Sequence, residues 1–262
     1  MQHIFILNPA AGKSGRLALF EEKIHALAKE KHLSYEVYHT SGVRDASRFV
    51  REYCLRDQET PLRFYACGGD GTINEVVSGA VGFANAEVAV VPIGTGNDFV
   101  RILGKNEDFL DLSAQMEAES QPIDLLRWND KYCVNMINVG FDGEVAARAG
   151  SARGRVPGKL AYIYGVLCEF FKMPTAKFRC EIDGVDMGEK KVQLSLYANG
   201  EFCGGGFHSA PYADLHDGLM DVCFICPVSR MTLIRLIGSY KKGTHMLLRE
   251  TQKYFEYYNS YQ

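Results

Sequence analysis

The run from Cys67 to Glu75 reads CGGDGTINE and combines residue types that suit phosphate chemistry. Its glycines let the backbone approach phosphate oxygens closely. The apolar stretch before the run predicts a strand, and the run itself opens an amphipathic helix, with Thr72 and Glu75 at the spacing of a capping box. The amino terminus of a helix attracts anions. The alternative is a tight turn in which Asp70 only caps the helix.

Two further segments have the same character. Val90–Phe99 reads VVPIGTGNDF and again follows an apolar strand with a turn that offers glycines, a hydroxyl and a carboxylate. Asn8–Gly15 reads NPAAGKSG. This segment is not a Walker A loop, because Leu7 stands where that loop needs its first glycine. Lys13 has two open interpretations, a phosphate ligand or an exposed loop cation.

The elements that must position these turns alternate in the first half of the chain. Short apolar runs predict buried strands at 3–7, 35–38, 64–67 and 88–91, and helical spacing predicts helices between them. This alternation is typical of a parallel α/β sheet, which binds ligands at the carboxyl ends of its strands.

The pattern changes after about residue 120. We expect antiparallel hairpins at 125–139 and, around the turn Asp183-Gly184, between 178–182 and 192–198, with helices at 159–172 and 230–248. The fold class predicted is therefore an α/β domain of the NAD-kinase and diacylglycerol-kinase kind over residues 1–122, followed by a β-rich sandwich domain over residues 123–262.

Composition restricts the partners. The chain has 262 residues, a net charge of −3, 47% hydrophobic and 23% charged residues, so nothing favours nucleic acid. We find neither a signal sequence nor an apolar run of about 18 residues. We expect a cytoplasmic protein that touches the inner membrane face peripherally and transiently, and a homodimer stays open.

Together these segments resemble the diacylglycerol kinase catalytic family, specifically its bacterial soluble lipid kinases. The order N-P-x-x-G, G-G-D-G-T-I-N-E and P-x-G-T-G-N-D-F carries the resemblance, which continues in Ile123-Asp124-Leu125 and in residues 217–222. It implies a kinase that transfers the γ-phosphoryl group of ATP to a lipid hydroxyl, most simply diacylglycerol giving phosphatidic acid. An NAD-kinase-like enzyme for a soluble substrate is the alternative.

The resemblance also implies site residues. Asp70, Asp98 and Asp124 would form an acidic, water-bridged Mg²⁺ network at the catalytic centre. A structural Mg²⁺ would be held in the second domain by the Asp217 carboxylate, with backbone oxygens from Asp214 and Leu219. The nucleotide would be bound by residues of the three turns and one strand end, namely Asn8, Gly12, Lys13, Thr40, Gly68, Gly69, Asp70, Gly71, Thr72, Ile73, Asn74, Gly94 and Thr95.

One departure from the family concerns its general base. That base is placed in a late D-G-E segment, which residues 254–262 do not contain. Asp142-Gly143-Glu144 has the same letters but matches an earlier family segment, so the role is not transferred to it. Two expectations follow: a shortened version of such a kinase, or a nucleotide-binding protein with impaired catalysis.

Overall fold

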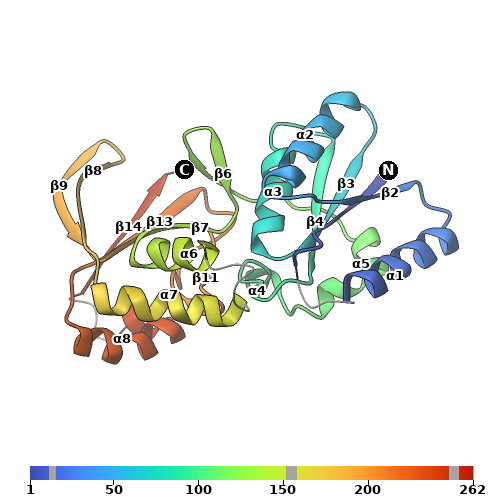
Figure 1. Cartoon of the computed structure of the whole chain (residues 1–262). Coiled ribbons are helices and arrows are strands. Elements are labelled where there is room, and N and C mark those ends of the chain that lie inside the picture. Colours follow the sequence, from blue (N-terminus) through green and yellow to red (C-terminus); the bar gives the residue numbers. More distant parts are fainter. Residues whose placement is uncertain (12–15, 152–157, 248–253, 262) are drawn as a thin grey trace. The chain divides into compact units, whose positions relative to one another are not determined.

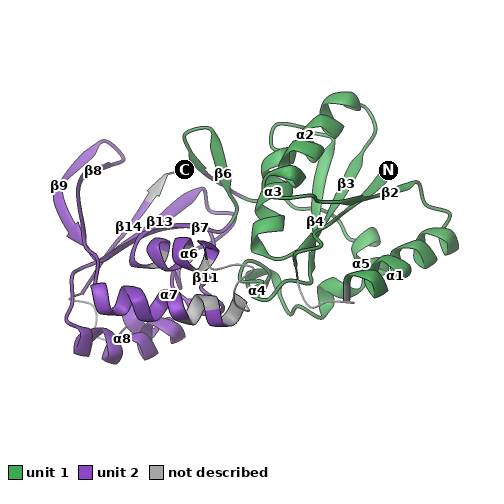
Figure 2. Cartoon of the chain, in the orientation of Figure 1, with its two compact units in different colours: residues 1–123, 127–134 green, residues 124–126, 135–262 purple. Residues whose placement is uncertain are grey.

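The computed structural model describes residues 1–11, 16–151, 158–247 and 254–261. The described chain forms two compact units (Figure 2). Unit 1 comprises residues 1–123 and 127–134, and unit 2 comprises residues 124–126 and 135–262. The sequence predicted a single division between residues 122 and 123, whereas the chain passes between the units three times. No helix in the described part of the chain is long and apolar enough to cross a membrane.

Unit 1 is built on a parallel sheet with the strand order β2-β1-β3-β4. Its elements are β1 (Gln2–Leu7), α1 (Arg16–Glu30), β2 (Tyr35–His39), α2 (Asp45–Arg56), β3 (Leu62–Gly68), α3 (Asp70–Ala80), β4 (Ala86–Pro92), α4 (Val100–Leu103), the 3₁₀ helix η1 (Asp108–Leu110), α5 (Leu112–Glu117), β5 (Leu126–Trp128) and β6 (Lys131–Cys133). The α/β fold predicted for this part is confirmed.

Both faces of this sheet are covered by helices (Figure 1). Phe20 and Ile24 of α1 pack with Leu112 of α5 on one face, in a core that includes Phe5 and Tyr65 of the strands. Helices α2 and α3 cover the opposite face. The two central strands, β1 and β3, are buried along nearly their whole length, and burial on both faces explains why their sequences are mostly apolar.

The register brings the carboxyl ends of the strands to one edge. Leu7 of β1 pairs with Cys67 of β3, and Gly68 of β3 pairs with Pro92 of β4. The segments that follow these three strands are therefore neighbours at that edge. Each of them is one of the turns singled out in the sequence.

The predicted capping box at α3 is wrong. The helix begins at Asp70 with Gly69 as its N-cap, three residues before the N-cap predicted at Thr72. The Thr72 hydroxyl instead accepts a hydrogen bond from the Asn8 side chain at 2.8 Å. Glu75 Oε1 accepts one from the Arg44 N–H at 2.9 Å. Both side chains therefore form hydrogen bonds with residues distant in the sequence and do not cap the helix.

Unit 2 contains an antiparallel sheet with the strand order β14-β13-β10-β7. Its elements are β7 (Met136–Gly140), α6 (Phe141–Ser151), α7 (Gly158–Lys172), β8 (Ala176–Ile182), β9 (Val185–Val192), β10 (Leu194–Ala198), β11 (Phe202–Cys203), β12 (Phe207–His208), β13 (Leu219–Ile225), α8 (Arg230–Lys242), the 3₁₀ helix η2 (Thr244–Met246) and β14 (Phe255–Tyr261).

Different elements pack on the two faces of this sheet. Phe178 and Ile182 of the hairpin β8–β9 pack against Phe224 on one face. On the other face, Tyr240 of α8 and Met246 pack against a core that includes Leu196. The β-rich sandwich expected for the second domain is confirmed.

Two details of the predicted hairpins are wrong. The strand that returns from Asp183-Gly184 is β9, and residues 194–198 form the separate strand β10 between β7 and β13. Likewise β6 ends at Cys133, and β7 pairs with β10 instead of extending the β5–β6 hairpin. Central strands are apolar because both faces are buried, and this pattern does not reveal their partners.

Candidate active site

Two glycine turns meet at the carboxyl edge of the parallel sheet. The Gly94 N–H donates to the Gly68 carbonyl oxygen at 3.0 Å. A Cβ atom on Gly94 would lie only 2.4 Å from the Gly69 Cα atom. Backbone therefore packs directly on backbone, and only glycine at position 94 permits this approach. The turn after β3 and the turn after β4 form one continuous surface.

Asp70 and Asp98 point into a common space at this junction. Asp70 Oδ1 accepts a hydrogen bond from the Phe99 N–H at 2.9 Å. A Cβ atom on Gly96 would lie 3.0 Å from Asp70 Oδ2 and 3.7 Å from Asp98 Oδ2. Because residue 96 is glycine, a small space between the two carboxylates stays open.

The electrostatics of this corner favour a cation. Burial raises the pKa of Asp70 above its usual range, and the negative charge of Asp98 acts in the same direction. Arg101 partly offsets the charge of Asp98, since its Nε atom lies 3.4 Å from Asp98 Oδ1. Two carboxylates that converge in a partly buried space are stabilised in their charged forms by a bound positive ion.

Asn8 links the end of β1 to the glycine turn that follows β3. Its side-chain nitrogen donates to Thr72 Oγ1, and its side-chain oxygen accepts from the Ala10 N–H at 2.9 Å. Thr40, at the end of β2, is anchored by its N–H to the Leu7 carbonyl oxygen at 2.9 Å. Gly12 and Lys13, which the sequence also assigned to the nucleotide, lie outside the described residues.

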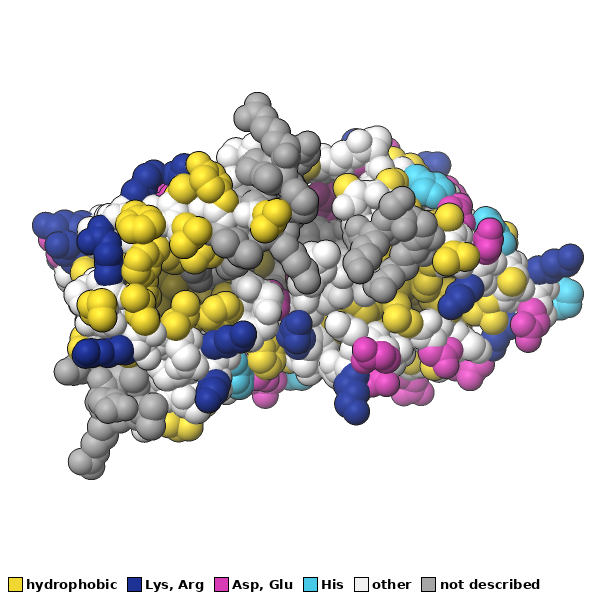
Figure 3. Space-filling model, turned by 60° about the horizontal axis from the view of Figure 1, so that its bottom comes forward, with side chains coloured by type: hydrophobic (Ala, Val, Ile, Leu, Met, Phe, Trp, Pro, Cys, Tyr) yellow, Lys and Arg dark blue, Asp and Glu magenta, His cyan; other side chains and the backbone are white. Residues whose placement is uncertain are grey.

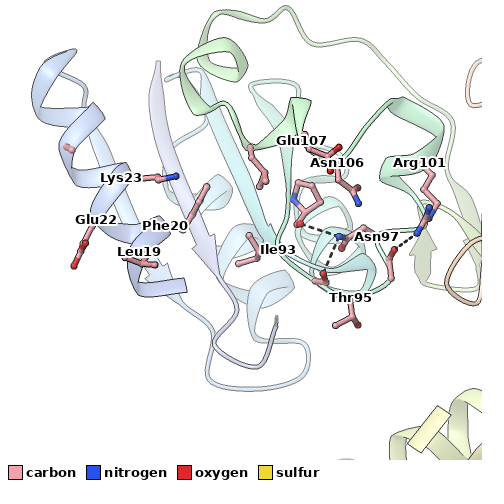
Figure 4. A pocket seen from close by; sticks show the side chains of 15 residues that line it. Leu19, Phe20, Glu22, Lys23, Ile93, Thr95, Asn97, Arg101, Asn106 and Glu107 are labelled. Carbon is pink, nitrogen blue, oxygen red and sulfur yellow. Dashed lines mark hydrogen bonds between the residues drawn. The ribbon is translucent and has the colours of Figure 1, made fainter. Parts of the chain in front are cut away.

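Asn97 holds the second turn in shape and was not singled out from the sequence. It adopts a left-handed conformation with φ of 53°. Its side-chain nitrogen donates to the carbonyl oxygens of Pro92 and Gly94, both at 3.2 Å (Figure 4). Asparagine tolerates this backbone region better than most residues, which was the available signal.

A cavity of 770 Å³ lies between this turn and α1 (Figure 4). Gly94 and Thr95 of the predicted nucleotide residues line it, and Phe20 and Ile93 provide an apolar part of its wall. Lys23 also lines the cavity. A cavity that combines an apolar wall, a glycine turn and a cation has the features of a site for a planar, anionic ligand such as a nucleotide.

Two predicted nucleotide residues have other partners. The Ile73 side chain is fully buried in the core. The Asn74 side chain holds the β5–β6 hairpin: its nitrogen donates to the Tyr132 carbonyl oxygen at 3.3 Å, and its oxygen accepts from the Val134 N–H at 3.0 Å. Both side chains therefore support the turn that precedes them, and the assignment of Ile73 and Asn74 to the nucleotide stays a prediction.

Asp124 and the predicted metal loop belong to unit 2. Asp124 Oδ2 accepts from the Gly218 N–H at 2.7 Å, which ties it to the loop that precedes β13. In that loop, Asp217 Oδ1 accepts from the Leu219 N–H at 2.8 Å. Asp214 Oδ1 similarly accepts from the His216 N–H at 3.0 Å. The three-carboxylate network of Asp70, Asp98 and Asp124 stays a prediction.

Asp221 is an acidic residue of this region that the sequence analysis did not single out. Its side chain is buried, and neither carboxylate oxygen has a hydrogen-bond partner among the described residues. Burial raises its pKa to about 7, and the charges of Asp217 and Asp214 add to the effect. Among the residues that the structure describes, no three His, Cys, Asp or Glu side chains gather closely enough to hold a metal ion.

Comparison with known proteins places both units in one family. The family model described as diacylglycerol kinase catalytic domain matches residues 2–128, and the YegS C-terminal NAD kinase beta sandwich-like domain matches residues 135–254. The diacylglycerol kinase of Bacillus subtilis (strain 168) is 29% identical over 247 residues, covering 92% of this chain and 79% of that one. A probable YegS-like lipid kinase of Pseudomonas aeruginosa is 32% identical over 229 residues, covering 86% and 74%.

A solved structure shares the fold. The crystal structure of a diacylglycerol kinase from Bacillus anthracis str. Sterne superposes with a TM-score of 0.70 at 22% identity, covering 99% of this chain and 83% of that one. The chain aligns with 60% of the length of a probable YegS-like lipid kinase of Alcanivorax borkumensis and with 79% of the Bacillus subtilis diacylglycerol kinase. The comparisons therefore account for both units of this chain and leave part of each relative unmatched.

Proposed function

The chain belongs to the diacylglycerol kinase family of bacterial lipid kinases, and we propose that it transfers the γ-phosphoryl group of ATP to the hydroxyl of a membrane lipid. Diacylglycerol is the acceptor that we favour, giving phosphatidic acid and ADP. The name of the Bacillus subtilis relative supports this choice of acceptor.

One observation carries the proposal. The turns after β3 and β4 pack backbone on backbone, so that Asp70 and Asp98 face one open space beside the amino terminus of α3. Phosphoryl transfer depends on charge neutralisation and alignment more than on covalent catalysis. Fixed backbone N–H groups and the helix dipole meet the first need at little reorganisation cost.

We assign the nucleotide to the surface formed by these turns. Gly69, Gly71 and Thr72 would face its phosphates, and Thr95 would line the adjoining cavity together with Gly94. Asn8 keeps Thr72 in place through the hydrogen bond between their side chains. The bound anion would gain most from the first turn of α3, where the positive end of the dipole lies.

Mg²⁺ fits the residues at the junction. The space beside Gly96 is flanked by carboxylate oxygens, and hard oxygen ligands with water are what Mg²⁺ prefers. When bound, this ion would neutralise phosphate charge. Asp70 and Asp98 would hold it, while Phe99 fixes the orientation of Asp70 through its N–H.

The loop before β13 also fits a cation. Asp214 and Asp217 each use one oxygen on a backbone N–H of the loop. Neither oxygen of the neighbouring buried Asp221 carboxyl group, in β13, has a hydrogen-bond partner among the described residues, and a cation nearby would favour the charged form of this group. We propose that Asp214, Asp217 and the backbone of Leu219 contribute to a structural Mg²⁺ site. The role of such an ion would be to hold the loop and, through Gly218, the Asp124 side chain.

Asp70→Asn tests the proposed function. The variant removes one charge but keeps an oxygen that can accept from Phe99, so the fold should survive. We expect transfer of radiolabel from γ-labelled ATP to dioleoylglycerol in mixed micelles to fall at least about a hundredfold. Asp130→Asn, in an exposed turn of the β5–β6 hairpin, is the matched control. Full activity of Asp70→Asn would refute the assignment.

The same assay separates the alternative functions. Addition of NAD as a competing acceptor would divert the label if the chain were an NAD-kinase-like enzyme. Calorimetric titration with MgATP distinguishes a protein that binds ATP without transferring it. If MgATP binds but no phosphoryl group is transferred to any diacylglycerol, the catalytic proposal is refuted and the proposed nucleotide site is supported.

A further inference from the structure

Two helices of unit 2 expose apolar side chains to solvent. On α7, Leu160, Tyr164, Leu167 and Phe171 recur at intervals of four, three and four residues, and all are more than half exposed. Such spacing places them on one face of the helix. On the opposite face, Gly165 packs closely against the backbone of Val145 in α6. The apolar face of α7 is therefore the one turned away from the unit.

Helix α8 continues this surface. Met231, Ile234 and Ile237 are between 46% and 62% exposed, while Leu236 on the other side of the helix is buried. The Arg230 guanidinium donates to the carbonyl oxygens of Phe170 and Phe171, which fixes the start of α8 against the end of α7. Figure 1 shows the two helices side by side.

The exposed charges on these helices all have the same sign. They are carried by Lys172, Arg230, Arg235, Lys241 and Lys242. The acidic residue of α7, Glu169, is buried; its carboxylate lies 2.7 Å from Arg148 Nε and 3.7 Å from Lys172 Nζ. Figure 3 shows hydrophobic side chains gathered around a hollow on this face, with basic side chains at its margin. Since the whole chain carries a net charge of −3, this positive charge is a local feature.

We propose that the α7–α8 face docks on the surface of an anionic phospholipid bilayer. This inference rests on the proposed function, because a kinase for a membrane lipid must reach its acceptor at the bilayer. Apolar side chains on amphipathic helices enter the boundary between headgroups and acyl chains. Lysine and arginine beside them attract the negative surface of the membrane. The face combines both features.

The charge of the α7–α8 face also favours an anionic bilayer over a second copy of the chain as its partner. A two-fold contact through the α7–α8 face would bring the same patch of each copy together. The five basic residues of one copy would then face those of the other, and like charges across an interface oppose association. An anionic bilayer removes this repulsion and accepts the apolar side chains.

Vesicle flotation with the whole chain tests the proposal. The vesicles contain phosphatidylcholine with or without about one third phosphatidylglycerol. We expect Leu167→Gln/Ile234→Gln to lower the partition coefficient at least about tenfold, because two apolar side chains lose their favourable transfer. The matched control is Leu55→Gln/Val185→Gln, whose side chains are 54% and 61% exposed outside the two helices. The control should differ from wild type by less than about twofold.

A charge variant separates the two contributions. Arg235→Gln/Lys242→Gln should bind anionic vesicles about tenfold or more weakly and bind neutral vesicles as wild type does. The anionic preference of the wild type should also fall with added salt. If either double variant on the α7–α8 face floats like the wild type, the proposal is overturned.

Two further measurements keep this inference apart from the proposed function. Phosphorylation of water-soluble dihexanoylglycerol should be unchanged in every variant. A wild-type protein that phosphorylates this substrate but binds no vesicles overturns the docking surface alone. A wild-type protein that docks through the face but phosphorylates no lipid refutes the function alone. If sedimentation shows a dimer that Leu167→Gln/Ile234→Gln dissociates, the face is an interface between copies and the proposal is overturned.

Discussion

Replacing Gly94 with alanine is expected to separate the two glycine turns. The added Cβ atom would lie 2.4 Å from Gly69 Cα, 2.9 Å from Gly69 N and 2.8 Å from Asn97 Oδ1. None of these atoms can swing aside, because two are backbone and Asn97 is held by hydrogen bonds from its side chain to the backbone of the same turn. Normal carbon contacts of about 3.5–4.0 Å require the turns to move apart by at least about 1 Å.

The size of the effect follows from this displacement. Overpacking of a tight site costs about 1–3 kcal/mol. Movement of the turns also weakens the hydrogen bond from the Gly94 N–H to the Gly68 carbonyl oxygen, which adds about 1 kcal/mol. We expect unit 1 to lose about 2–4 kcal/mol of unfolding free energy.

Urea unfolding followed by tryptophan fluorescence measures this loss. The chain contains one tryptophan, Trp128, which lies in unit 1 and therefore reports on that unit. With an m-value of about 2 kcal/mol/M, the midpoint should fall by about 1–2 M. MgATP affinity should fall as well, because the phosphate surface is displaced.

Gly71→Ala provides the contrast. No atom lies within 4 Å of a Cβ added at Gly71, which is exposed in the first turn of α3. The fold should keep its stability, since alanine suits a helix better than glycine. MgATP affinity should nevertheless fall if phosphate oxygens approach this backbone. If Gly94→Ala unfolds at the wild-type midpoint, the backbone contact between the turns does not have the importance assigned to it.

Three further substitutions test buried and half-buried polar side chains of the two units. Burial lowers the pKa of His245 to about 4, so the stability that the neutral imidazole contributes above pH 6.5 is lost as the pH falls. Between pH 7.5 and 5 the wild type should lose about 2 kcal/mol more unfolding free energy than His245→Phe. Urea unfolding at both pH values measures this difference. Asn74→Ala should cost about 1–3 kcal/mol, because the Val134 N–H loses its acceptor; a wild-type Trp128 unfolding curve would contradict this. Arg63→Met should cost about 3–5 kcal/mol by chemical denaturation, since buried Arg63 pairs with Glu87 and donates to three backbone carbonyl groups; an unchanged midpoint would show that the pair contributes nothing.

The sequence predicts best what depends on neighbours along the chain. The parallel sheet of unit 1 could be predicted because strands buried on both faces are continuously apolar and the helices between them are amphipathic. The turn at Asp183-Gly184 was also recognisable, and both residues have positive φ as a tight hairpin requires. These features need no knowledge of distant contacts.

Features that depend on distant contacts were missed. The Asn8 side chain bonds to Thr72, 64 positions away, and this contact displaced the predicted capping box. Strand β9, which reads VDMGEKKV, has no apolar run because its hairpin covers the sheet from outside. The more apolar β10 was therefore taken for the returning strand. Asp221 could not be recognised either, since only the fold shows that its carboxylate is buried.

The anchoring of Val134 by Asn74 limits how this protein can be divided. A fragment that stops at residue 122 would lose the hairpin whose backbone satisfies the Asn74 amide, and the helix behind the glycine turn would lose a support. A fragment designed to bind nucleotide by itself has to extend to residue 134. Such a fragment also includes Asp124–Leu126, which belong to unit 2. Recombination between relatives would accordingly succeed at residue 134 more often than at residue 122.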